Sequence, residues 1–103
     1  MNLESIAPVL LGTKTLHHMT ARQLGVVALV CSSDAGPWTV RGLALQIGVA
    51  KPAITRAIDK LATELALMTR KPDPHDGRSV LVVSTPAGRK FMADLNKALA
   101  RAR

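Results

Sequence analysis

Two short helical patterns on either side of a glycine constrain the fold of this chain more than any other feature. The first covers about residues 40–47, where Thr39 is a typical N-cap and Gly48 readily ends a helix in a left-handed conformation. The second covers about residues 51–65 and opens with Lys51-Pro52. A helix, a tight turn and a second helix predict a helix-turn-helix unit.

The second helix has two faces of different character. Its apolar face is made of Ile54, Ile58, Leu61 and Leu65. The opposite face carries Lys51, Pro52, Thr55, Arg56 and Asp59. This spacing predicts a helix that packs one side on a core and exposes polar, partly basic groups on the other.

The rest of the sequence supplies elements that fit around this unit. The patterns predict a helix over about 21–33 behind a Thr20–Gln23 capping box, an extended segment at 38–40, strands at 67–70 and 79–84 around a turn at 72–78, and a last helix over about 86–102. Residues 3–19 show a weak amphipathic pattern, and Pro8 and Gly12 limit any helix there.

The predicted fold class is therefore mainly α with a small β-hairpin wing (α+β). It is a winged helix-turn-helix with a three-helix core and terminal helices. Residues 20–85 form the predicted DNA-binding domain, and residues 1–19 and 86–103 form helical segments expected to dimerise. Dimerisation is expected because Leu95, Leu99 and the apolar residues of 3–16 have no other evident partner.

The charge distribution points to a polyanionic partner. The chain of 103 residues has a net charge of +7. Residues 1–40 carry equal numbers of basic and acidic side chains, so the whole excess lies in residues 41–103. A one-sided basic surface is typical of nucleic-acid binding. Aromatic residues make up only 2% of the chain, which argues against a protein that stacks single-stranded bases.

Other function classes find little support in the sequence. The single cysteine, Cys31, lies on an apolar stripe and is expected in the core, and Trp38 is expected as a packing anchor where the short strand meets the wing. The histidines lack metal-ligand spacing, and no catalytic constellation or phosphate loop is present. We expect a non-enzymatic protein without metal or cofactor, with no membrane association, in the cytoplasm at the nucleoid.

Three successive motifs resemble the MarR family of bacterial transcriptional regulators. They are VAKPAITRAIDKL, RKPDPHDGR and STPAG, within a resemblance over about residues 20–88. The resemblance implies a dimeric winged helix that binds pseudo-palindromic double-stranded DNA, usually as a repressor. It places the recognition helix at about 51–65 in the major groove and the wing in the minor groove. Arg78 would be the wing arginine, braced by Asp76.

The chain departs from the family pattern in two ways. Ala50 stands where relatives often have a serine that caps the recognition helix. Its terminal segments are also shorter than the extended dimerisation helices of the family. The sequence leaves open whether a small-molecule effector binds.

These observations predict a sequence-specific regulator of transcription. The expected DNA-contacting residues are Thr39, Arg41, Lys51, Pro52, Thr55, Arg56, Arg70, Lys71, His75, Asp76 and Arg78. Arg56 is expected to read base edges and Arg78 the minor groove, whereas Arg70 and Lys71 are expected to contact phosphates. Asp59 and Lys60 are expected to serve solvation or local pairing. Two alternatives remain: a non-specific architectural DNA binder, and a winged-helix module that binds a protein.

Overall fold

The computed structural model describes residues 2–32 and 36–102. Its elements in chain order are α1 (Leu3–Gly12), α2 (Lys14–His17), α3 (Ala21–Cys31), β1 (Trp38–Thr39), α4 (Val40–Ile47), α5 (Lys51–Asp59), the π-helical turn η1 (Lys60–Glu64), β2 (Met68–Asp73), β3 (Asp76–Ser84) and α6 (Pro86–Arg101). The helix expected over 21–33 ends at Cys31, and position 33 lies outside the described residues.

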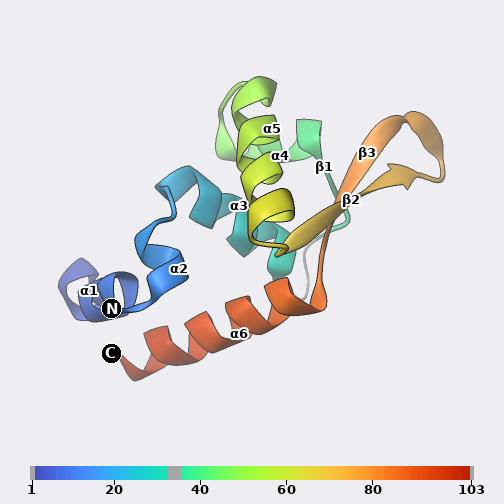
Figure 1. The fold of residues 1–103 in the computed structure, drawn as a ribbon. Helices are drawn as coiled ribbons and strands as arrows, with labels where there is room; N and C mark the ends of the chain where they lie inside the picture. Colours follow the sequence, from blue (N-terminus) through green and yellow to red (C-terminus); the bar gives the residue numbers. More distant parts are fainter. Residues whose placement is uncertain (1, 33–35, 103) are drawn as a thin grey trace.

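The architecture confirms the predicted fold class. Helices α3, α4 and α5 pack together, and the hairpin of β2 and β3 projects from them as a wing (Figure 1). Strand β3 is central in a three-stranded antiparallel sheet of order β1-β3-β2. Helix α6 runs along the side of the molecule away from α5 and the wing, and both chain ends lie together beside α1 (Figure 1). No helix among the described residues is long and apolar enough to cross a membrane.

The core is aliphatic, as the scarcity of aromatic residues predicts. Its fully buried large side chains are Val26, Val27, Leu43, Ile54, Ile58, Leu61, Met68 and Val82. Cys31 is buried among them, which confirms its predicted packing role. Trp38 donates from Nε1 to the Leu29 carbonyl at 3.1 Å and pairs with Val82 of the wing, as expected of a packing anchor.

Helix ends follow the local signals in the sequence. Thr20 and Gln23 form the predicted capping box at α3, with bonds of 3.1 and 2.9 Å. The Thr39 hydroxyl accepts from the Gly42 amide at 2.9 Å and caps α4. Gly48 then ends α4 with φ 80°, a conformation that costs glycine little. These bonds satisfy backbone groups that a helix end leaves without partners.

The N-terminal segment is more helical than predicted. Helix α1 continues through Pro8, which was expected to limit it, and ends at Gly12. Pro8 removes one backbone donor, while the Asn2 side chain caps the helix by accepting from the Ser5 amide at 2.9 Å. Helix α1 has no fully buried residue, so its apolar side chains are only partly covered.

The second helix of the predicted helix-turn-helix unit is less regular than predicted. Its α-helical part ends at Asp59 and continues as the π turn η1. A π turn holds more residues than an α turn, which changes the direction of the side chains that follow. Leu61 is buried as predicted, whereas Leu65 is only half-buried. Ala66 then takes a left-handed conformation with φ 54° and leads the chain into β2.

The wing is longer and its turn shorter than predicted. Residues 72–78 were expected to form the turn, but β2 continues to Asp73 and β3 starts at Asp76, which leaves Pro74 and His75 at the tip. Strand β2 lies at the edge of the sheet, where a proline such as Pro72 is tolerated. A register shift between Pro72 and Asp73 closes the hairpin.

Candidate nucleic-acid interface

Helix α5 is oriented by its buried face. Ile54, Ala57 and Ile58 pack into the core, so the opposite side of the helix faces outward. Lys51 and Arg56 are exposed on that side. The exposed Pro52 lies in the first turn of the helix, and the half-buried Thr55 donates to the Lys51 carbonyl at 3.1 Å. The core packing of α5 therefore presents the residues that the sequence assigned to DNA contact.

The wing carries its charged residues along exposed strands. Asp76 accepts from the Arg78 amide at 3.0 Å and from the Ser79 hydroxyl at 3.1 Å. Asp76 thus holds the backbone of Arg78, and no guanidinium bond to Asp76 is found among the described residues. Arg78 lies on β3 rather than at the end of a loop, which corrects its expected position.

A hollow of about 380 Å³ lies between α5, the start of α4 and the wing. Its walls are Thr39, Val40, Arg41, Lys51, Thr55, Arg70, Arg78, Ser79 and Val80. Four of these described lining residues are cationic and none is acidic. The fold therefore gathers most of the basic side chains that were predicted as DNA contacts, although they come from four separate elements.

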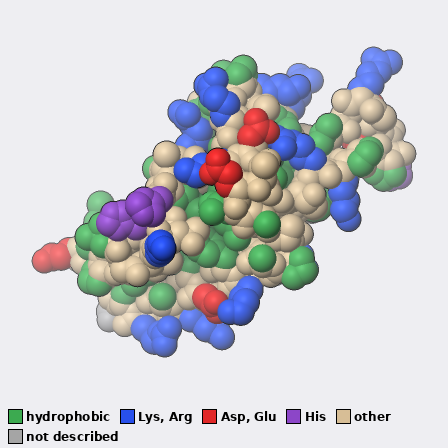
Figure 2. Space-filling view, in the orientation of Figure 1, with side chains coloured by type: hydrophobic (Ala, Val, Ile, Leu, Met, Phe, Trp, Pro, Cys, Tyr) green, Lys and Arg blue, Asp and Glu red, His purple; other side chains and the backbone are tan. Residues whose placement is uncertain are grey.

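Other predicted contacts lie outside this hollow. Arg56 lines a second depression of about 340 Å³ with Asp59, Lys60, Thr63 and Glu64. Lys71, His75 and Asp76 are exposed on the outer part of the wing. Lys and Arg side chains gather at the end of the molecule that carries α4 and α5, and blue side chains also project from the wing (Figure 2). A further group follows α6 (Figure 2).

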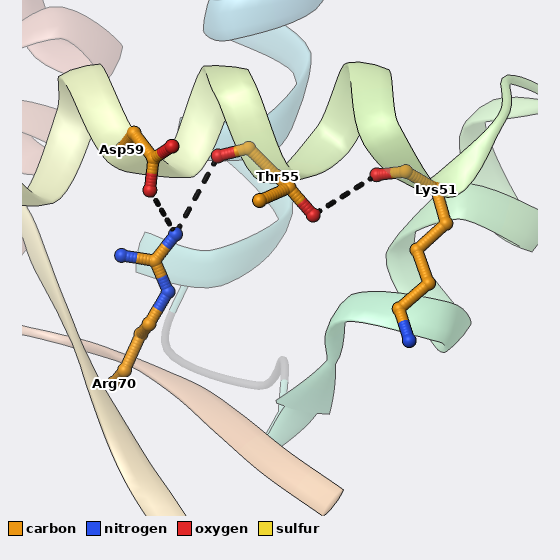
Figure 3. A network of polar contacts seen from close by, with 4 residues as sticks. All are labelled: Lys51, Thr55, Asp59 and Arg70. Carbon is orange, nitrogen blue, oxygen red and sulfur yellow. Dashed lines mark hydrogen bonds and ion pairs between the residues drawn. The ribbon is translucent and has the colours of Figure 1, made fainter.

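Arg70 makes a contact that sequence reasoning did not anticipate. Its Nη2 donates to Asp59 Oδ1 at 2.5 Å and lies 3.5 Å from the Thr55 carbonyl oxygen (Figure 3). Asp59 was expected to serve solvation or local pairing, yet it reaches from α5 to the base of the wing. The spacing of Thr55 and Asp59 places them on one helix face, but only the tertiary fold brings Arg70 beside them.

The buried thiol lies away from this interface. Burial raises the pKa of Cys31, and the positive charge of Arg89 opposes this to a smaller degree. The thiol lies 3.5 Å from the Leu67 carbonyl oxygen. The described residues contain no group of three His, Cys, Asp or Glu side chains able to hold a metal ion.

Comparison with known proteins agrees with this geometry. The sequence profile of the MarR family matches residues 22–80. This chain belongs to the MarR family. An HTH-type transcriptional regulator of Bacillus subtilis, YcgE, is 31% identical over 96 residues, which cover 86% of this chain and 62% of the relative. A regulator of Mycobacterium leprae is 40% identical over 76 residues, covering 74% of this chain and 50% of the relative.

Solved structures of the MarR family share the fold. A MarR-family regulator from Rhodococcus sp. RHA1 has a TM-score of 0.73 and 27% identity, covering 97% of this chain and 66% of its own. CouR from Rhodococcus jostii RHA1, solved with p-coumaroyl-CoA bound, has a TM-score of 0.74 and 28% identity over similar shares of 97% and 66%. The present chain spans about half to three-fifths of the length of the curated relatives.

Proposed function

We propose that this MarR-family chain binds duplex DNA as part of a homodimeric transcriptional repressor with a pseudo-palindromic operator. The observation that carries the proposal is the basic hollow between α5 and the wing. Such a concave cationic surface attracts the phosphate backbone and releases its condensed counterions. The named relatives are transcriptional regulators, which supports the same activity for this chain.

Helix α5 and the wing have complementary roles in this proposal. The major groove is wide enough for an α-helix, and α5 is the helix whose polar face is exposed. Arg56 and Thr55 supply base-reading chemistry, with Lys51 and Pro52 at the helix start. Arg78 on the wing enters the minor groove, where narrow A·T-rich segments concentrate negative potential. Thr39, Arg41, Lys71 and His75 contact the sugar-phosphate backbone on either side.

The dimer in this proposal forms through the two ends of the chain. Leu95, which was expected to lack a partner within the protomer, is instead buried in the core. The exposed apolar side chains at this end are Leu3 and Leu11 of α1, which are 77% and 66% exposed. Helix α1 lies beside the C-terminal part of α6, so both predicted dimerisation segments share one side of the molecule (Figure 1). A two-fold axis there would place two copies of α5 on successive half-sites about one helical turn apart. The protein would act in the cytoplasm, without metal, cofactor or catalytic step.

Titration with DNA tests the proposal and separates it from its alternatives. Fragments selected from the source genome are compared with random duplex by gel shift at several salt concentrations. We expect the selected operator to bind at least about a thousandfold more tightly than random DNA, with affinity falling as salt rises. Tight binding without preference would instead identify an architectural protein. Absence of salt-dependent binding would contradict the proposal and favour a module that binds proteins.

A further inference from the structure

One ion pair links the recognition helix to the wing. Arg70, near the start of β2, reaches Asp59 at the end of α5 with an Nη2–Oδ1 distance of 2.5 Å (Figure 3). The same nitrogen lies 3.5 Å from the carbonyl oxygen of Thr55, one turn earlier. Within residues 2–32 and 36–102, these are the hydrogen bonds that a wing side chain makes to α5. Arg70 thus contacts two successive turns of the helix.

The ion pair with Asp59 reduces the attraction of Arg70 for DNA. Its guanidinium group shares its charge with a carboxylate, so it contributes little net attraction for a phosphate. Asp59 also brings a negative charge close to the proposed DNA surface, which by itself weakens binding to a polyanion. A contact that reduces attraction for DNA is better explained by the geometry it fixes. The Arg70 side chain is 34% exposed, so the pair is partly shielded from solvent.

The base of the wing is also held by backbone pairing and burial, because Val82 of β3 is buried and β3 pairs with β1. Met68, two residues before Arg70, is buried in the core and fixes the start of β2. Beyond Arg70, the side chains of Lys71 and Pro72 are exposed. Both strands are therefore anchored at the base of the wing, and Arg70 adds side-chain hydrogen bonds that tie β2 directly to α5.

We propose that Asp59 and Arg70 form a positioning pair that fixes the wing relative to the recognition helix, and that Arg70 is not itself a phosphate contact. This inference rests on the proposed function, because it concerns how both grooves of one duplex are read together. With the pair intact, α5 and the wing keep a single separation that suits a particular operator and its flanks. The pair therefore contributes to specificity more than to affinity.

The substitutions Asp59→Asn and Arg70→Gln have different expected signatures. Asp59→Asn releases Arg70, so binding to random duplex tightens. The salt slope, which is the slope of log affinity against log salt concentration, steepens by about one charge. Arg70→Gln leaves the salt slope unchanged. We compare affinities for the operator with its native flanking sequences and for the same operator with exchanged flanking sequences. Both substitutions reduce the ratio of these two affinities by about fivefold, in line with the coupling of a partly exposed ion pair. The double variant loses no more preference than Arg70→Gln alone, because both changes remove the same interaction.

A second ion pair provides matched controls. Lys90 and Asp94 on α6 form an exposed pair at 3.1 Å, away from α5 and the wing. Asp94→Asn and Lys90→Gln make the same charge changes and should leave flank preference unaltered. Thermal unfolding and light scattering of every variant verify that the fold and the oligomeric state are kept. If Arg70→Gln lowers the salt slope by about one while Asp59→Asn leaves flank preference intact, Arg70 is a phosphate contact and the inference is wrong.

A measurement without DNA separates this inference from the proposed function. Spin labels are placed at Thr63→Cys and Gly77→Cys in a Cys31→Ser background, and their distance distribution is recorded with Asp59 or with Asp59→Asn. We expect a narrow distribution with Asp59 and a broader one with the asparagine. Equal widths would overturn the positioning role even if DNA binding is found. A broader distribution would support it even if the chain proves to bind another partner.

Discussion

At position 88 the backbone of α6 lies almost in contact with the chain segment that enters the wing. A Cβ atom on Gly88 would stand 1.9 Å from the Leu67 carbonyl oxygen and 2.9 Å from Cys31 Sγ. The glycine of the STPAG motif is therefore needed for close packing rather than for an unusual φ. The sequence shows that a glycine is present, but the neighbour that requires it is 21 residues away.

Gly88→Ala should consequently destabilise the protein by about 3 kcal/mol, because the Leu67 backbone must move. Gly25→Ala is the matched control: it adds the same methyl group in α3, where nothing lies within 4 Å. That change should stabilise the protein by about 0.5–1 kcal/mol through helix propensity. Urea unfolding of both variants checks the prediction. Equal effects of the same sign would show that the close approach at Gly88 is not limiting.

The thiol of Cys31 should react slowly in the native protein. Burial raises its pKa, so at a given alkaline pH less reactive thiolate is present than in the unfolded chain. Alkylation by iodoacetamide at pH 8 should be many times slower without denaturant than with it. Because its pKa is raised in the folded protein, the Cys31 thiol contributes to stability at pH values below the pKa of the unfolded thiol. This contribution declines as pH rises through the pKa of the folded thiol. Rapid native alkylation would contradict burial.

At the scale of elements, most helix ends can be predicted because a cap is a local interaction. Thr39 and Gly48 bound α4 through contacts within four residues along the chain. The end of α5 differs: η1 and the left-handed Ala66 depend on fitting Leu61 and Leu67 into a core built from distant segments. The pattern over 51–65 could not distinguish a π turn from a regular helix.

The start of α5 offers a simple gain in stability. Ala50 already has the extended backbone of an N-cap, with φ −69° and ψ 147°, but no side chain to accept a bond. Ala50→Ser should add that bond and stabilise the protein by about 1 kcal/mol. Thr39→Ala, which removes the existing 2.9 Å cap of α4, should cost a similar amount. Thermal unfolding measures both, and unchanged stability on Ala50→Ser would show that α5 is capped by other means.

Replacing an arginine on α5 and replacing one on the wing should weaken DNA binding in different ways. Arg56→Ala should lower discrimination between operator and random duplex by about 1–3 kcal/mol, as expected for a lost base contact. Arg78→Ala should weaken binding most at A·T-rich flanks and reduce the salt slope by about one. Arg22→Ala on α3, outside both the proposed DNA surface and the proposed dimer surface, is the control and should change neither. Full affinity of both variants in salt-dependent gel shifts would rule out the proposed roles of α5 and the wing.

For the whole molecule, the arrangement of the ends predicts self-association. Leu11 is 66% exposed on α1, whereas Leu45 is 75% exposed on α4, outside the proposed dimer surface. Light scattering at micromolar concentration should therefore detect a dimer. Leu11→Glu should shift it to monomer because it places a charge in an apolar interface, and Leu45→Glu should not. A monomeric parent protein would argue against dimerisation through these segments.

The sequence by itself determined the order of elements from α3 to α6 apart from η1, the caps of α3 and α4, the aliphatic core and the family. Each of these depends on residues within about one or two helical turns, or on a motif whose spacing can be read directly. The tertiary structure alone decided the length of the wing, the need for glycine at position 88 and the pairing of Asp59 with Arg70. These depend on how separate segments approach in space, which periodicity along one element does not specify.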